Sequence, residues 1–174
     1  MKLLVCISKV PDTTSKINFV DNNTKFDESG VQYIVNPYDE WYALVRALEL
    51  VEKHGGTVTT ITVGTNADDP TIRKALAIGA NDAVRIDANP TDPYFVAKQI
   101  ADFASGESYD VILTGKETIN YNGSQIGGMV AELLDMPFVS LGTKLDIEGN
   151  LATLERDVQG GVEVIEVNTP FVVS

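Results

Sequence analysis

The segment GKETINYNGSQIGGMVAELL, from Gly115 to Leu134, joins an apolar run to an amphipathic helix pattern through a loop of small polar residues. A loop that opens a helix presents unpaired backbone N–H groups and the positive end of the helix dipole. Gly115 would let the backbone approach a ligand, and Ser124 and Gln125 would add side-chain donors. The pattern therefore predicts phosphate binding. The alternative is structural: Asn122 and Ser124 cap a helix, and the glycines turn the chain.

Common motifs of nucleotide chemistry are absent from this loop. The chain has no G-x-x-x-x-G-K-[ST], and Lys116 precedes the predicted helix, so NTP hydrolysis lacks its usual lysine. G-x-G-x-x-G is also missing, which counts against an NAD-type fingerprint. No carboxylate pair stands out, and Cys6 has no neighbouring base that would activate its thiol. The residues favour binding over side-chain catalysis, so neither catalytic residues nor a metal site are predicted.

The elements that must position the loop follow from an alternation of strand and helix patterns. Short apolar or β-branched runs predict strands at 3–7, 57–63, 82–86 and 109–114. Helical spacing predicts helices at 39–53, between 68 and 79, at 93–105 and at 123–134. This spacing suits right-handed crossovers, so we predict an α/β fold with a doubly wound, mostly parallel sheet. Ligands of such sheets bind beyond the carboxyl ends of the strands, where the loop begins.

Two segments depart from the alternation. Residues 11–35 carry turn signals around two short β patterns, and we predict a hairpin that joins 17–20 to 31–35. From Pro137 the pattern changes to short strands with tight turns at EGN and QGG, which predict antiparallel pairs. We expect one domain over 1–174, with an α/β nucleotide-binding core at 1–135 and a β-rich extension at 136–174.

Composition restricts the possible functions. The chain has 174 residues and a net charge of −12, which disfavours nucleic acid and anionic membranes as partners. A small anion held by backbone N–H groups stays possible. One Cys and one His leave no internal disulfide and no Cys-rich or His-rich metal site. No apolar stretch of membrane-spanning length occurs, so we expect no membrane insertion and a cytoplasmic protein.

Five motifs, taken together, are similar to one known family. They are LLVCISKVPDT, NPYDEWYALVRALEL, TIRKALAIGANDAVRI, ILTGKETINYNGSQIGG and LERDVQGGVEVIEVNTPFVVS, in this order along the chain. Over nearly its whole length the chain resembles the beta subunit of the electron-transfer flavoproteins. The resemblance implies an adenine-nucleotide-binding, Rossmann-like fold.

The resemblance also implies partners and cofactors. Family members pair with an alpha subunit that holds the redox-active FAD, and the beta subunit helps to enclose that FAD. The beta subunit usually binds a buried, structural AMP; in electron-bifurcating members it holds a second FAD. The complex carries electrons from acyl-CoA or other dehydrogenases to a downstream acceptor. On this reading the chain is an electron-carrier subunit and not an enzyme.

Residue by residue, the resemblance carries the nucleotide contacts to specific positions. Backbone at Val63 and Gly115 would meet the adenine, while Ser124, Gln125 and the N–H of Ile126 would meet the phosphate. The implied contact residues are Cys6, Asn36, Pro37, Tyr38, Asp39, Val63, Gly115, Lys116, Asn122, Gly123, Ser124, Gln125 and Ile126.

The chain departs from the family at two places. AMP-type members carry several acids, and bifurcating members Asp-Gly-Asp-Thr, where this chain has Asn120 to Ser124. Gln125 is shared by both kinds, so both nucleotides stay open. The family continues past TPFVVS into an arm that wraps the alpha subunit, whereas this sequence stops at Ser174. We therefore expect weak assembly with an alpha subunit.

Two other classes compete with this interpretation. One is a stand-alone nucleotide-binding protein of the universal-stress type, but the hairpin-rich segment after Pro137 speaks against it. The other is an adenylating enzyme of the same broad fold. Such an enzyme would need a Ser-Gly-Gly-type pyrophosphate loop after the first strand, and SKVPDTTS is not one.

Overall fold

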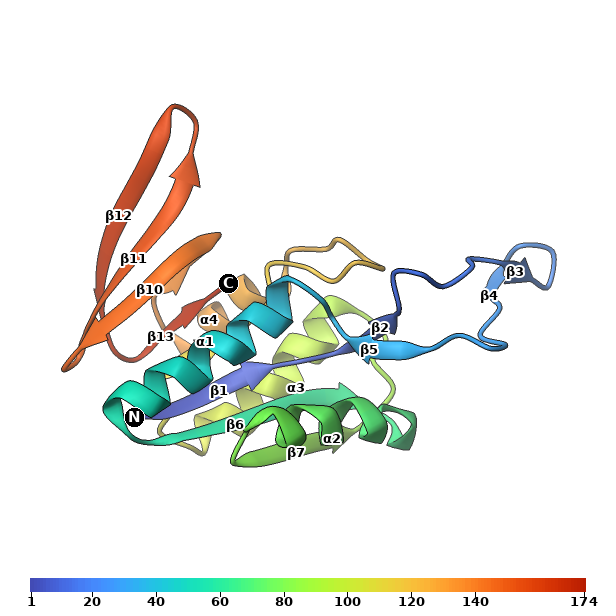
Figure 1. The fold of residues 1–174 in the computed structure, drawn as a ribbon, viewed down its shortest axis with the longest axis horizontal. Helices are drawn as coiled ribbons and strands as arrows, with labels where there is room; N and C mark the ends of the chain where they lie inside the picture. Colours follow the sequence, from blue (N-terminus) through green and yellow to red (C-terminus); the bar gives the residue numbers. More distant parts are fainter.

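The computed structural model describes residues 1–174 and is built around a six-stranded parallel sheet (Figure 1). The strand order is β7-β6-β1-β8-β13-β9. The chain enters this sheet in the middle and winds outward in both directions, as predicted for a doubly wound fold. The strands are β1 (Lys2–Cys6), β6 (Thr57–Gly64), β7 (Asp82–Asp87), β8 (Val111–Leu113), β9 (Phe138–Val139) and β13 (Phe171–Val173).

Helices cover both faces of this sheet because the central strands are apolar on both sides. Leu3 and Val5 of β1 face a core that α1 and α2 complete, whereas Leu4 and Cys6 face a second core closed by α3 and α4. Successive side chains of a strand point to opposite faces, so one apolar run serves both cores. The helices are α1 (Asp39–His54), α2 (Asp69–Ile78), α3 (Pro93–Ser105) and α4 (Ile126–Leu134), and a 3₁₀ turn, η1 (Asn66–Asp68), precedes α2. None of these helices is both long and apolar enough to cross a membrane.

A second, antiparallel sheet follows from the C-terminal hairpins. It consists of β10 (Gly142–Glu148), β11 (Leu151–Val158) and β12 (Gly161–Asn168), in that order. Leu145, Ile147 and Leu154 join the core beneath α1, while the far end of the β11–β12 hairpin extends away from the body (Figure 1). The predicted tight turns at EGN and QGG are confirmed, and so is the antiparallel pairing that they imply.

The N-terminal excursion differs from its prediction. The predicted hairpin between 17–20 and 31–35 is wrong: β5 (Tyr33–Val35) pairs with β2 (Lys9–Pro11), and β3 (Phe19–Val20) pairs with β4 (Lys25–Phe26). The turn between β3 and β4 explains the change, because three successive residues, 21–23, have positive φ and reverse the chain early. This small hairpin projects on the opposite side of the molecule from β11–β12 (Figure 1).

Candidate functional site

The candidate site lies where the central strands end. β1 pairs in parallel with β6 and β8, with Cys6 opposite Ile61 and Val5 opposite Leu113. The carboxyl ends of all three strands therefore meet at one edge of the sheet. This register brings Cys6, Val63 and the loop that starts at Gly115 to the same edge of the sheet.

Asn36 holds the loop in place. Its side chain is fully buried. Its Nδ2 donates to the carbonyl oxygen of Glu117 at 2.9 Å, and its Oδ1 accepts from the N–H of Ile119 at 3.1 Å. Asn36 was predicted to contact a ligand, but the hydrogen bonds of its side chain are made to the backbone of the loop. Asn36 joins two segments that are more than eighty residues apart in sequence.

The turn that leads into α1 is strained. Tyr38 has a φ of 68° and a ψ of −84°, a conformation that non-glycine residues rarely adopt. Its side chain is exposed, and its ring lies 6.4 Å from that of Tyr42, one helical turn later. The backbone carbonyls of Pro37 and Tyr38 accept from Asp39 and Tyr42, respectively, which fixes the turn.

Glu40 is a residue of this edge that the sequence analysis missed. It is buried, and its carboxylate accepts from the Ser8 backbone N–H at 2.7 Å and from the Ser8 hydroxyl at 2.9 Å. Burial raises the pKa of the Glu40 carboxyl to about 8, although the Ser8 hydrogen bonds act in the opposite direction. The sequence does contain a signal for the burial of Glu40, because Glu40, Leu44 and Ala47 lie at helical spacing on the buried face of α1.

The loop packs tightly against Glu40 at one end and is open at the other. A Cβ added at Gly115 would lie 2.7 Å from Cγ of Glu40, so only glycine fits there without movement. At Gly123, a Cβ would meet nothing within 4 Å. Gly115 is therefore needed for packing inside the protein, whereas Gly123 faces open space.

The predicted start of α4 at residue 123 is wrong, because the helix begins at Ile126. Asn122 and Ser124 have φ values of 50° and 52°, which no α-helix accommodates. Neither the N-cap, Gln125, nor another side chain caps the first turn, so the capping alternative is not supported. The backbone N–H groups of Gly123, Ser124 and Gln125 donate to no acceptor in the chain and are free for a ligand.

The remaining predicted residues occupy different surroundings. Cys6 is buried in the core beneath α3 and α4, and burial raises the pKa of its thiol, which keeps it neutral. Val63 packs partly buried against the same core. Asp39 and Lys116 line a groove of about 620 Å³ between α1 and β10, away from these two side chains. Of the predicted contact residues, only Asp39 and Lys116 line this groove.

Comparison with known proteins identifies the family. Residues 23–174 match the model of the electron transfer flavoprotein domain. The chain belongs to the electron transfer flavoprotein family. It is 39% identical to the electron transfer flavoprotein subunit beta of Bacillus subtilis (strain 168), over all of this chain and 68% of that relative. The resemblance to the beta subunits is thereby confirmed.

Other relatives extend the comparison. The chain is 34% identical to the protein FixA of Azorhizobium caulinodans, over all of its own length and 65% of that protein. It is also 34% identical to the mitochondrial electron transfer flavoprotein subunit beta of Oryza sativa subsp. japonica, of which it covers 71%. Membership of the electron transfer flavoprotein family implies association with a flavin and a role in electron transfer.

Proposed function

We propose that the chain acts as the beta subunit of a heterodimeric electron transfer flavoprotein and binds AMP as a structural ligand. In this role it helps to enclose the FAD of an alpha subunit, which carries electrons from acyl-CoA or other dehydrogenases to a downstream acceptor. It is an electron-carrier subunit and not an enzyme. We infer that it acts in the cytoplasm, in keeping with its single, unpaired Cys6.

One observation carries the AMP proposal. Three consecutive backbone N–H groups, from Gly123 to Gln125, lack acceptors immediately before the first turn of α4. Free N–H groups and a helix N-terminus together favour a phosphate. The loop starts at the carboxyl edge of β8, beside β1, so an adenosine extending from that phosphate would reach the ends of the central strands.

A second FAD at the same site is the alternative. The open space at Gly123 favours it, because a pyrophosphate needs more room next to the backbone than a single phosphate. The two nucleotides share an adenosine monophosphate part, so the same loop contacts would serve both. The larger ligand would extend past Gly123 into solvent or against a partner.

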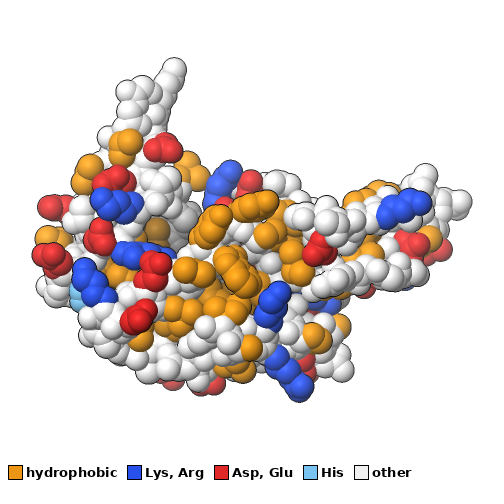
Figure 2. All heavy atoms as spheres, viewed as in Figure 1, with side chains coloured by type: hydrophobic (Ala, Val, Ile, Leu, Met, Phe, Trp, Pro, Cys, Tyr) orange, Lys and Arg blue, Asp and Glu red, His pale blue; other side chains and the backbone are white.

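The surface supports a protein partner for the chain. Figure 2 shows apolar side chains gathered over the middle of one face, between the two projecting hairpins. Tyr38, Tyr42 and Tyr121 are among the large apolar side chains that stay exposed. Exposed apolar patches and tyrosines are typical of protein interfaces. An alpha subunit seated against this face is the partner that family membership suggests.

Identification of the bound nucleotide tests the proposal. The purified chain is heated, the precipitate is removed, and the released nucleotide is identified by mass and quantified by absorbance. We expect about one equivalent of AMP and no stoichiometric flavin. Stoichiometric, reducible FAD would instead establish the alternative. If no nucleotide is released and added AMP does not bind, the proposed site is wrong.

A further inference from the structure

Glu117 places a carboxylate inside the loop that is proposed to bind a phosphate. Its Oε2 accepts from the hydroxyl of Ser124 at 3.0 Å, and its Oε1 lies 3.1 Å from Nζ of Lys116. The side chain of Asn122 is a third donor. Three of the side-chain donors proposed for the phosphate site, those of Lys116, Asn122 and Ser124, are therefore already bound to an anion of the chain itself, whereas the Gln125 side chain is not.

The backbone that carries this carboxylate is anchored to the protein interior. The carbonyl oxygen of Glu117 accepts from the buried amide of Asn36, and the N–H of Ile119 is held by the same side chain. The Glu117 side chain is 22% exposed. The backbone at Glu117 is thus anchored to the protein interior, while the carboxylate can turn toward solvent if a competitor takes its donors.

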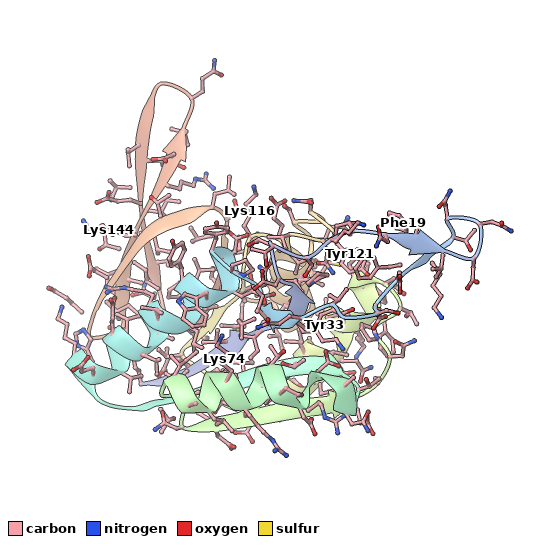
Figure 3. All side chains as sticks on the ribbon, turned by 45° about the vertical axis from the view of Figure 1, so that its right-hand side comes forward. Phe19, Tyr33, Lys74, Lys116, Tyr121 and Lys144 are labelled. Carbon is pink, nitrogen blue, oxygen red and sulfur yellow. The ribbon has the colours of Figure 1, made fainter.

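The charges around the loop decide the effect of such a competitor. Figure 3 shows Lys116 and Tyr121 on this loop, and Lys116 is the cation that pairs with Glu117. Hydrogen bonds from Lys116, Ser124 and Asn122 lower the pKa of Glu117, so its carboxyl is ionised at neutral pH. A phosphate near Ser124 would lie close to the negative charge of Glu117 and would have to compete for the donors that this carboxylate occupies.

We propose that Glu117 determines the ligand specificity of the site by competing with a nucleotide phosphate for Lys116 and Ser124. The proposal rests on the AMP site of the proposed function. Glu117 lowers the affinity for phosphate-bearing ligands and leaves the affinity for the neutral nucleoside unchanged, because adenosine has no group that needs these donors. In the native chain, the ratio of the AMP affinity to the adenosine affinity is therefore smaller than it would be without the Glu117 charge.

The test is the Glu117→Gln substitution, which keeps the shape of the side chain and removes its charge. At a separation of about 6 Å and an effective dielectric constant of about 40, repulsion between two unit charges corresponds to about a tenfold change in the binding constant. We expect Glu117→Gln to bind AMP about tenfold more tightly than the native chain, and to bind adenosine equally well. Isothermal titration of the nucleotide-free, full chain with each ligand measures both values.

Glu132→Gln is the matched control. Glu132 is exposed on α4, its side chain makes no hydrogen bond or ion pair, and its loss changes the net charge by the same amount. This variant should bind both ligands as the native chain does. Equal melting temperatures of the two variants and the native chain would show that folding is unaffected.

The outcomes separate this inference from the proposed function. If neither AMP nor adenosine binds the native chain, the nucleotide site itself is wrong, and the inference fails with it. If the native chain binds AMP and Glu117→Gln binds it no more tightly, Glu117 does not compete with phosphate, and only the inference is overturned. An equal gain for AMP and adenosine would also overturn it, because that result would mean a general change in the loop.

Discussion

Replacing Gly115 with Ala tests whether the loop after β8 packs directly on the start of α1. The added Cβ would lie 2.7 Å from Cγ of Glu40 and 3.0 Å from Cβ of Asp39. The φ of Gly115 is outside the left-handed region, so the backbone itself accepts alanine and the cost is steric. Either the loop or the first turn of α1 has to move.

The size of the effect follows from what holds Glu40. Its carboxylate accepts two hydrogen bonds from Ser8 in a buried position, so it is no flexible side-chain end that could step aside. Overpacking of this kind costs about 1–3 kcal/mol. We expect the free energy of unfolding to fall by about 2 kcal/mol. For a chain of this size that corresponds to a melting temperature about 4–8 °C lower.

Thermal unfolding followed by circular dichroism measures the melting temperature of Gly115→Ala, with Gly123→Ala as the matched control. A Cβ at Gly123 meets nothing, so alanine there should leave the melting temperature unchanged or raise it slightly through the unfolded state. Nucleotide must be removed from both variants, since a ligand that binds the folded state would raise both values. If Gly115→Ala has the same melting temperature as Gly123→Ala, the loop does not pack on Glu40 as described.

Two further changes test the same edge of the sheet. The pKa of Glu40 is raised from its ordinary value of 4.5 to about 8 in the folded chain. The unfolded chain therefore releases this proton at a lower pH than the folded chain does. As a result, the contribution of Glu40 to the free energy of unfolding falls as pH rises from about 4.5 to about 8. Glu40→Gln should flatten this part of the pH profile in urea unfolding, and parallel profiles would contradict the assignment. Asn36→Ala would leave the N–H of Ile119 and the carbonyl of Glu117 unpaired, at a cost of about 1–3 kcal/mol in the free energy of unfolding. Faster hydrogen exchange at Ile119 together with weaker AMP binding would confirm that Asn36 holds the loop in place.

Most of the central fold could be predicted from the sequence, because it follows from local apolar patterns. The residues predicted for the third helix, 93–105, are those of α3, and the strand predicted at 82–86 lies within β7. Runs such as 3–6 bury side chains on both faces, and only a sheet covered on both sides accommodates them. The doubly wound architecture follows from these runs and their spacing.

The details of the site depended on contacts that no local pattern encodes. Asn36 looks like an ordinary residue before a proline, yet it is fully buried and bonded to a loop far along the chain. The start of α4 was predicted three residues too early, because residues 123–125 were assigned to its first turn, whereas the positive φ of Ser124 delays the helix to Ile126. The pairing of β2 with β5 likewise depends on where the intervening turn closes, which composition alone does not determine.

Under the proposed function, the net charge of −12 does not prevent anion binding at this edge, because the carboxyl groups of Glu40, Glu117 and Asp39 are each partly offset locally. Burial raises the pKa of Glu40, which favours the uncharged form of this carboxyl. Glu117 is paired with Lys116 and Ser124. Asp39 lies in the first turn of α1, where the helix dipole offsets its charge. On the proposed function, an approaching phosphate would meet a set of free N–H groups and the Glu117 carboxylate, which would compete with it for the Ser124 hydroxyl.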